Sequence, residues 1–337
     1  MSMKGGLGLA AKKEFENLKR HGVRQCIYRG LRQVLYYANR GVVSYYFARH
    51  FRDYVIREIN GRKMLLSLGK DAGISKDLYI FGRREDGTTD YVLTSGIVRE
   101  GDTVMDIGAN IGYYVLIWSG LVGENGLVYA IEPVEENYGI LRKNMELNGV
   151  NNIETYQVAA GGVDGEDYLY VCSKRNYSAF YPDGLPEHVS GKDIKMMEKV
   201  KVVTVDSFLK DKKHPVLIRM DVEGYESEVI KGMEKTLEDD IMLLVEVHMN
   251  IMGPGRFREM VCALRDKGFT DALIIYDNEP LELAGRQSRA GALIDRLDCL
   301  IKEKRTGGRK RVDILKVLEE ESTCQMLFCK KGAGCIL

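Results

Sequence analysis

The strongest constraint on the fold is an alternation of short β-rich runs with helical segments between residues 103 and 276. This alternation is typical of βαβ units arranged around a parallel sheet. Residues 241–247 form an almost continuous apolar run, which indicates a sheet covered by helices on both faces. We therefore expect an α/β protein with a seven-stranded, mostly parallel sheet. The expected strands are residues 103–107, 127–132, 153–160, 216–221, 241–247, 272–276 and 325–328.

Three segments lie outside this alternation. Residues 1–75 are expected to be helical and basic, and residues 173–197 are expected to form a long loop or lid. Residues 285–319 are expected to be a basic helical insertion before the last strand. We therefore divide the chain into a basic N-terminal extension, residues 1–75, and a core domain, residues 76–337.

The charge of the chain is distributed unevenly. The 49 Lys and Arg residues balance the 49 Asp and Glu residues over the whole chain. Residues 1–75, however, contain fifteen basic and only five acidic residues. Residues 20–57 combine helical spacing of apolar residues with interleaved arginines, which predicts an amphipathic basic helix. Such a helix would bind an anionic membrane surface that carries a lipid-linked glycan, bind RNA, or pack on the acidic core domain. Nucleic acid is disfavoured because no Asn-Pro-Pro-aromatic base-flipping motif occurs.

The sequence also bears on the compartment. No run of about 18 uncharged apolar residues exists, and the first residues lack the apolar region of a secretory signal. The seven cysteines are odd in number and form no CxxC pair, which predicts reduced thiols rather than a disulfide framework or a zinc site. We expect a cytoplasmic protein that the basic segment can hold at the inner face of a membrane.

The most informative motif is DIGANIG, residues 106–112, where a strand turns into a helix. Gly108 and Gly112 permit a sharp turn and a close approach of a ligand to the positive end of the helix. The spacing is G-x-x-x-G rather than the G-x-G-x-x-G of dinucleotide sites, and Asp106 would repel a pyrophosphate. The motif favours S-adenosylmethionine, which carries a cationic sulfonium, over NAD or an ordinary β–α turn.

A second strand end supports this cofactor. Glu132 ends the second expected strand, where its carboxylate could accept both ribose hydroxyls, and Pro133 fixes the chain that follows. Small residues at positions 159 and 160 leave room for an adenine ring. The expected cofactor-binding residues are Asp106, Gly108, Asn110, Gly112, Tyr113, Glu132, Pro133 and Ala160.

Four ionisable residues follow the fourth and fifth expected strands. Asp221 and Glu223 alternate with apolar neighbours, as do Glu246 and His248, so each pair projects to one side of its strand end. We expect these four residues to be catalytic, since ligands of open α/β sheets bind beyond the carboxyl ends of the strands. They could act as general base or as metal ligands, and we favour base catalysis without a metal. A structural imidazole at His248 and a helix-capping acid at Glu223 are the alternatives.

Over residues 78–275 the chain resembles the FkbM-type S-adenosylmethionine-dependent O-methyltransferases. The resemblance rests on the runs DIGANIG (106–112), EP (132–133), RMDVEGYE (219–226), VIKG (229–232) and EVH (246–248). It implies a class I methyltransferase fold, which is Rossmann-like, and methylation of hydroxyls on sugars or polyketide-like acceptors. We expect an O-methyltransferase that acts on a sugar hydroxyl of a glycan or lipid-linked glycan. A polyketide or lipid hydroxyl, RNA, an NAD-dependent oxidoreductase and a non-enzymatic binding protein are the alternatives.

Overall fold

The computed structural model describes residues 54–68, 74–172, 178–180, 194–277, 309–319 and 324–330. All of them belong to one compact unit, formed by Arg52–Asn278 and Arg305–Leu337. The expectations for residues 1–53, for most of the lid at 173–197 and for residues 285–308 therefore lie outside the described residues.

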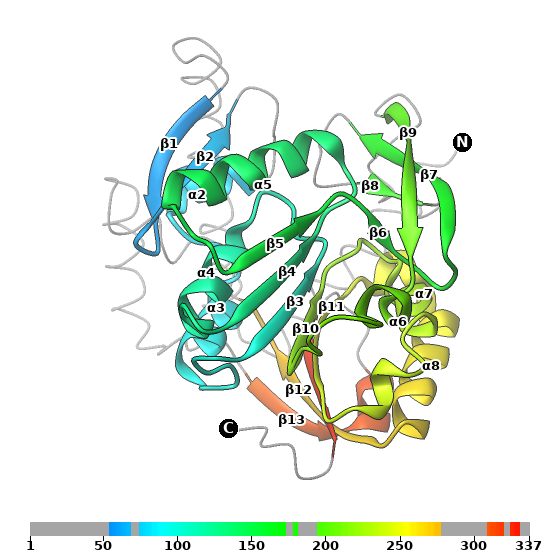
Figure 1. Cartoon of the computed structure of the whole chain (residues 1–337). Coiled ribbons are helices and arrows are strands. Elements are labelled where there is room, and N and C mark those ends of the chain that lie inside the picture. Colours follow the sequence, from blue (N-terminus) through cyan, green and yellow to red (C-terminus); the bar gives the residue numbers. More distant parts are fainter. Residues whose placement is uncertain are drawn as a thin grey trace, which may run out of the picture. The chain divides into compact units, whose positions relative to one another are not determined.

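The central sheet is built from strands whose sequence order and spatial order differ. The strands are β3 (Thr103–Ile107), β4 (Leu127–Ile131), β5 (Ile153–Tyr156), β10 (Leu217–Met220), β11 (Met242–Val247), β12 (Phe269–Ile275), β13 (Arg309–Asp313) and β14 (Cys324–Lys330). Their order is β13-β12-β14-β11-β10-β3-β4-β5, with β14 antiparallel to both of its neighbours. β3, β4, β5, β10 and β11 pair in parallel. The predicted mostly parallel sheet is confirmed, with eight strands where seven were expected (Figure 1).

An eighth strand extends this sheet where a helix was expected. β13 lies within the predicted helical insertion 285–319 and pairs antiparallel with β12. Arg309, Lys310 and Arg311 are exposed along it, while Val312 is buried. Charged side chains suit an outermost strand, since they oppose further pairing at the exposed edge.

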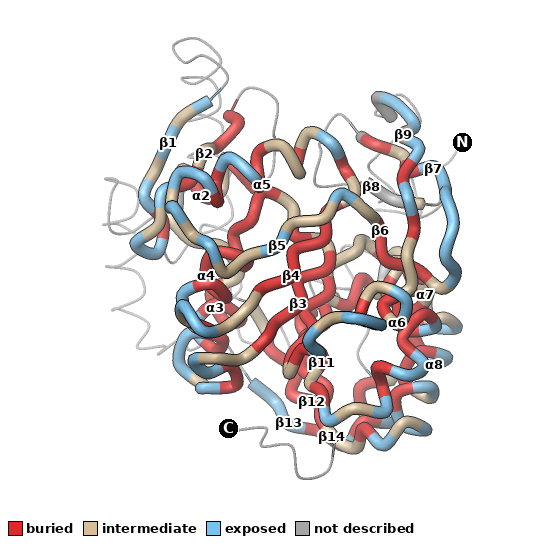
Figure 2. The backbone as a smooth tube through the Cα atoms, viewed as in Figure 1, coloured by how far each residue is buried: buried red, intermediate tan, exposed pale blue. Residues whose placement is uncertain are grey.

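Helices cover both faces of the sheet, as predicted. They are α2 (Ile74–Phe81), α3 (Asp86–Thr94), α4 (Tyr113–Val122), α5 (Glu135–Asn148), α6 (Val205–Leu209), α7 (Glu226–Lys231) and α8 (Met249–Asp266), with 3-10 turns η2 (Thr236–Glu238) and η5 (Ile314–Glu319). Alternate residues of β3, Met105 and Ile107, pack in one core with residues of α6, α7 and α8. α4 contacts β3 and β4, and Figure 1 shows it on the opposite side of the sheet from α7 and α8. Every residue of β3 and β10 is consequently buried (Figure 2).

The described part of the N-terminal region is a β-hairpin rather than the helix expected over residues 1–75. β1 (Tyr54–Ile59) and β2 (Arg62–Ser67) pair antiparallel through Asn60 and Gly61, both with positive φ. An Asn-Gly pair is the preferred two-residue hairpin turn, so this signal was present in the sequence. The hairpin is bound to α5, since the side chain of Asn144 accepts a hydrogen bond from the backbone of Leu65 at 2.6 Å. It therefore packs as part of the core domain.

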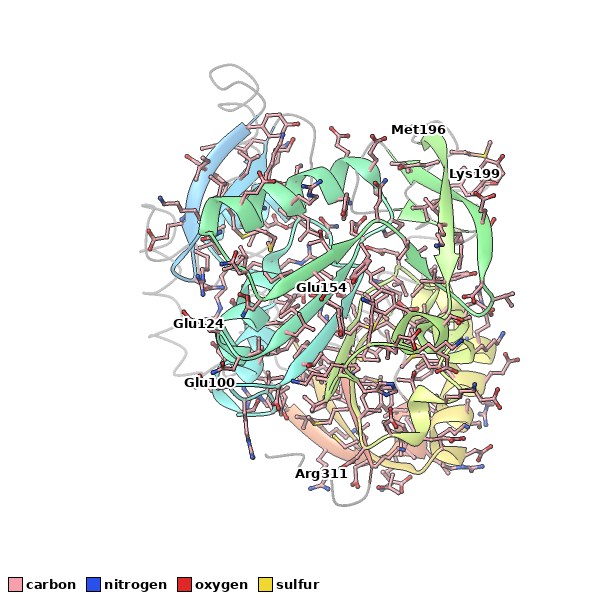
Figure 3. The ribbon with its side chains drawn as sticks, viewed as in Figure 1. Glu100, Glu124, Glu154, Met196, Lys199 and Arg311 are labelled. Atoms are coloured by element: carbon pink, nitrogen blue, oxygen red, sulfur yellow. The ribbon has the colours of Figure 1, made fainter. Side chains whose placement is uncertain are left out.

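A smaller sheet stands beside the central one and corrects the third predicted strand. The run 153–160 does not continue as one strand, because β6 (Ala159–Ala160) leaves the central sheet and pairs with β9 (Ile194–Val203). β7 (Gly165–Cys172) joins β9 to β8 (Ser178–Ala179), which falls within the predicted loop 173–197. Figure 3 shows Met196 and Lys199 projecting from β9. The turn between β5 and β6 brings Ala159 and Ala160 to the end of the central sheet.

Two expectations concern the surroundings of the protein. Among the described residues, no helix is both long and apolar enough to cross a membrane. Cys262 and Cys324 carry free thiols, as expected. The expectation of reduced thiols is wrong at Cys329, which is disulfide-bonded.

Candidate active site

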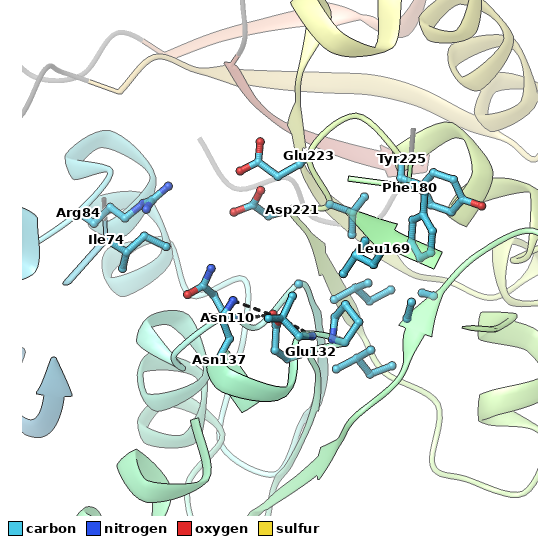
Figure 4. Close-up of a pocket in the computed structure, with 18 residues that line it drawn as sticks. Ile74, Arg84, Asn110, Glu132, Asn137, Leu169, Phe180, Asp221, Glu223 and Tyr225 are labelled. Carbon is cyan, nitrogen blue, oxygen red and sulfur yellow. Dashed lines mark hydrogen bonds between the residues drawn. The ribbon is translucent and has the colours of Figure 1, made fainter. Parts of the chain in front are cut away.

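A pocket lies at the carboxyl ends of β3, β4 and β10 (Figure 4). Five of the predicted cofactor-binding residues line it, namely Gly108, Asn110, Glu132, Pro133 and Ala160. Asp221 and Glu223 line its acidic side, whereas Leu169 and Phe180 from the smaller sheet region line its apolar side. The strand ends therefore form one site, as the parallel sheet predicts.

Gly108 is required by the packing of the sheet as well as by the turn. Its φ is +81°, and a Cβ added to it would lie 1.9 Å from the carbonyl oxygen of Asp221. The backbone nitrogen of Asp221 in turn donates to the carbonyl of Ile107 at 3.0 Å. The residue that closely approaches Gly108 is thus Asp221, at the end of β10, where the sequence had predicted a ligand. This contact fixes Asp221 beside the turn.

Glu132 is buried at the end of β4 and is held by backbone donors. Its Oε2 accepts a hydrogen bond from the backbone nitrogen of Asn110 at 2.8 Å, and its Oε1 accepts one from that of Val134 at 3.0 Å. Burial raises the pKa of Glu132 to about 7, against the opposing effect of these hydrogen bonds. Asn110 has a φ of +50°, which directs its backbone nitrogen toward this carboxylate.

Asp106 does not reach the pocket. It is fully buried in β3, where Nη1 of Arg219 donates to its Oδ1 at 3.2 Å. The same guanidinium donates through Nη2 to Oδ2 of Asp221 at 2.9 Å and lies 4.3 Å from the ring centre of Tyr114. Burial alone would lower the pKa of Arg219, but Asp106 and Asp221 raise it well above its ordinary value. Asp106 thus positions Arg219, and through it Asp221, instead of lining the predicted cofactor site.

Two other predicted cofactor residues also lie away from this pocket. A Cβ on Gly112 would lie 2.7 Å from a methyl group of Leu141, so this glycine allows α4 and α5 to pack closely. Tyr113 lines a neighbouring cavity of about 300 Å³ that shares Gly108, Asn110 and Asp221 with the main pocket. Its hydroxyl lies 3.2 Å from Oγ1 of Thr89 in α3.

The four predicted catalytic residues converge around His248. Its Nε2 lies 3.4 Å from Oε2 of Glu223, 3.6 Å from Oε1 of Glu246 and 4.0 Å from Oδ1 of Asp221. Asp221 and Glu223 line the pocket, while Glu246 and His248 are absent from its lining. The alternation of residues at the ends of β10 and β11 predicted this convergence.

The pKa values of the group diverge, because charges of both signs lie close together. Burial and the neighbouring Asp221 and Glu85 raise the pKa of Glu246 well above its ordinary value. Burial raises that of Glu223 to about 7. Burial also opposes ionisation of Asp221, but Arg219 lowers its pKa overall. Divergent pKa values within one cluster are typical of functional sites.

Sequence reasoning assigned no role to three further residues of the site. Glu226 in the first turn of α7 is fully buried, and its Oε1 lies 2.9 Å from Nδ1 of His248. Arg84 lines the pocket and forms an ion pair with Glu85. Glu226 was visible in the sequence as part of the run RMDVEGYE, but the residues before α3 carry no periodic or motif signal.

Two models of methyltransferase families match parts of the chain. Residues 106–270 match the model of the methyltransferase FkbM domain, and residues 15–167 match that of protein-L-isoaspartate(D-aspartate) O-methyltransferase. Protein-L-isoaspartate O-methyltransferase of Fervidobacterium nodosum is 39% identical over 71 residues, which are 21% of this chain and 35% of that protein. The chain thus spans about a third of the length of this relative.

Two further relatives align over longer stretches. Methyltransferase 1 of Beauveria bassiana is 26% identical over 195 residues, which cover 53% of this chain and 77% of that protein. Hexuronic acid methyltransferase AglP of Haloferax volcanii is 26% identical over 156 residues, which cover 45% of this chain and 59% of that protein. Residues 106–270, which include most of the parallel sheet and of the pocket at its strand ends, are thus similar to the FkbM domain of S-adenosylmethionine-dependent methyltransferases.

Proposed function

We propose that the protein transfers a methyl group from S-adenosylmethionine to a hydroxyl of a sugar in a glycan or lipid-linked glycan. The observation that carries this proposal is the two-sided pocket. A buried carboxylate, Glu132, lies beside an apolar wall on one side, and the carboxylates of Asp221 and Glu223 lie on the other. Such a pocket is suited to a ligand with ribose hydroxyls, a flat base and a cationic centre.

The residues present fit this cofactor. Glu132 accepts a backbone hydrogen bond at each oxygen, and its Oε1 also accepts one from Nδ2 of Asn137 at 3.4 Å. A carboxylate has about four acceptor sites, so Oε2 can still accept a ribose hydroxyl. Pro133, Leu169 and Phe180 provide apolar contact for adenine. Asp221 and Glu223 complement a sulfonium. When bound, the cofactor supplies a methyl carbon on a good leaving group, which passes to the acceptor oxygen as the carbon–sulfur bond breaks.

The chain's own residues must orient the acceptor and remove its proton. Asp221 and Glu223 line the pocket and are the two predicted catalytic residues that can touch the acceptor. Arg219 and His248 hold them in place from behind, at 2.9 Å and 3.4 Å respectively. A hydroxyl is a poor nucleophile until its proton leaves, and a carboxylate within hydrogen-bond reach can take that proton.

The similarity to protein-L-isoaspartate O-methyltransferases raises a second candidate, methylation of a peptide carboxylate. The acidic wall opposes it, because the carboxylates of Asp221 and Glu223 would repel an anionic acceptor. A neutral hydroxyl meets no such repulsion. The relative named as a hexuronic acid methyltransferase supports a sugar acceptor.

Two measurements test the proposal. Calorimetry with S-adenosylhomocysteine and with NAD should detect binding of the first and not of the second. Methyl-labelled cofactor, incubated with neutral oligosaccharides, a polyketide alcohol, RNA and an isoaspartyl peptide, should then label the oligosaccharides. Asp221→Asn should still bind S-adenosylhomocysteine, which lacks the sulfonium charge, and should lose at least about 100-fold in turnover, in line with loss of a general base. Labelling confined to the peptide or to RNA would overturn the acceptor class.

A further inference from the structure

The imidazole of His248 is oriented by a residue behind it. The side chain is buried, at 8% exposure, and among the described residues its hydrogen bond is made through Nδ1 to Oε1 of Glu226. A carboxylate partner at Nδ1 favours the tautomer in which Nδ1 carries the proton. The lone pair of Nε2 then faces Glu223, Glu246 and Asp221.

In this neutral tautomer Nε2 presents no donor to the three carboxylates. Burial opposes a charge on His248, but Glu223, Glu226 and Glu246 raise its pKa well above its ordinary value, so a proton competes with a cation for Nε2. A neutral imidazole nitrogen and ionised carboxylate oxygens all carry lone pairs, so they repel one another unless a cation or a proton lies between them. The cluster formed by Asp106, Asp221, Glu223, Glu226, Glu246 and Glu85 contains six carboxyl groups. Arg84 and Arg219 supply two positive charges against these six carboxyl groups. Arg219 lies within 4.0 Å of four of them, and the other two, Glu223 and Glu226, contact His248.

The spacing of the ligand atoms agrees with metal coordination. One atom each from Asp221, Glu223 and His248 lies within 4.8 Å of the other two. In an octahedron with bonds of about 2.1 Å, neighbouring ligands are roughly 3.0 Å apart and opposite ligands roughly 4.2 Å apart. The distances of 3.4 Å and 4.0 Å from Nε2 to Glu223 and Asp221 fall within this range.

We propose that Asp221, Glu223 and His248 bind a divalent cation of the Mg²⁺ or Mn²⁺ class. Two carboxylates and one imidazole form a mostly oxygen donor set, which suits these ions better than the thiolate-rich sets preferred by structural zinc. Glu226 serves as the outer partner that fixes the imidazole, a common arrangement at metal-ligating histidines. The sequence had favoured a metal-independent base at these residues.

The cation site rests on its own geometry, and only its catalytic role rests on the proposed function. Because Asp221 and Glu223 line the pocket, a cation between them faces the acceptor side of that pocket. There it stabilises negative charge on the acceptor oxygen as the hydroxyl proton leaves to a neighbouring carboxylate. The remaining coordination positions are open to water and to the acceptor.

The test is a titration of the full chain with Mn²⁺ alone, followed by the electron paramagnetic resonance signal of free Mn²⁺. The wild-type protein should bind one equivalent, and Mg²⁺ should compete. His248→Ala and Glu223→Gln should each weaken Mn²⁺ binding at least tenfold. His214→Ala is the matched control, since it removes a surface histidine paired with Asp239 and should leave the affinity unchanged.

The possible outcomes separate the two proposals. Absence of Mn²⁺ binding by the wild-type protein at millimolar concentration overturns the cation site, and a proton on His248 then provides the missing positive charge. Equal binding by wild type and Glu223→Gln also overturns it, and circular dichroism establishes that each variant is folded. Mn²⁺ binding without S-adenosylhomocysteine binding retains the cation site and rejects the proposed methyl transfer.

Discussion

Oε1 of Glu226 lies 2.9 Å from Nδ1 of His248 and 3.1 Å from the backbone nitrogen of Gly224. One fully buried carboxylate thus orients the imidazole from α7 and also holds the turn that carries Glu223. Glu223 has a φ of +52°, in the left-handed region that residues other than glycine rarely adopt. The positions of His248 and Glu223 therefore depend on Glu226, which does not line the pocket.

Replacement of Glu226 tests this positioning role. Glu226→Ala should weaken Mn²⁺ binding about 10- to 100-fold, because the imidazole loses the partner that fixes its tautomer. Glu226→Gln keeps an oxygen that can accept from Nδ1 and should recover most of the affinity. The Mn²⁺ titration measures both variants. An equal loss in the two variants would point to the charge of Glu226, not to its hydrogen bond.

Substitution of Gly108 tests the junction between β3 and β10. Gly108→Ala places a Cβ 1.9 Å from the carbonyl oxygen of Asp221 at a φ of +81°, so the backbone must move. We expect a loss of about 3 kcal/mol or more in the free energy of unfolding, measured by urea denaturation. Gly139→Ala in α5 is the control, since its added Cβ meets no atom within 4 Å. It should stabilise the protein by up to about 1 kcal/mol.

The raised pKa of Glu132 predicts a pH dependence of cofactor binding. Its pKa of about 7 means that the carboxylate form, which accepts ribose hydroxyls, is lost as the pH falls from 8 to 6. The dissociation constant of S-adenosylhomocysteine should therefore rise over this interval, approaching tenfold per pH unit at its lower end. Glu132→Gln should bind more weakly and show no such trend. Calorimetry at several pH values distinguishes these results, and tighter binding at pH 6 would contradict the assignment.

Asp277 predicts a separate effect of pH on stability. Its carboxylate accepts hydrogen bonds from the backbone and hydroxyl of Thr88 at 2.8 Å and 2.9 Å, and burial raises its pKa from 3.8 to about 6. The folded state therefore binds this proton more tightly than the unfolded state does. The resulting stabilisation is present below about pH 3.8 and is lost as the pH rises to about 6, with a total of at most about 3 kcal/mol.

Asp277→Asn isolates that effect, because an amide can make both contacts with Thr88 and does not titrate. The difference in unfolding free energy between wild type and variant should shift against the wild type as the pH rises from 4 to 6. Urea denaturation at four or five pH values measures it. A constant difference would show that Asp277 does not bind a proton in this range.

Much of the site could be predicted because it follows from local order along the chain. In a parallel sheet the carboxyl ends of neighbouring strands share one edge, so residues that end the runs 127–132, 216–221 and 241–247 must meet. Glu132, Asp221 and Glu246 were found in this way. The alternation of side chains then placed Glu223 beside Asp221 and His248 beside Glu246.

The misplaced residues are those whose partners come from distant parts of the chain. Asp106 precedes the glycine turn, but the register of β3 with β10 sets it opposite Arg219, where the two form a buried ion pair. Gly112 is required by the packing of α5, since a Cβ there would lie 2.7 Å from a methyl group of Leu141. The helix predicted over residues 1–75 is wrong at residues 54–67, where the Asn60-Gly61 turn closes a β-hairpin.

The sequence by itself determined the parallel sheet, the edge at which the pocket opens and the carboxylates that line it. These features depend on periodicity and on the order of residues along single strands. Only the tertiary structure decided that Asp106 orients Arg219, that Glu226 fixes His248 and that three carboxyl groups surround one imidazole nitrogen. Those contacts depend on strand register and on the packing of α7 beside β11, which fix distances of a few ångströms between residues that no local pattern relates.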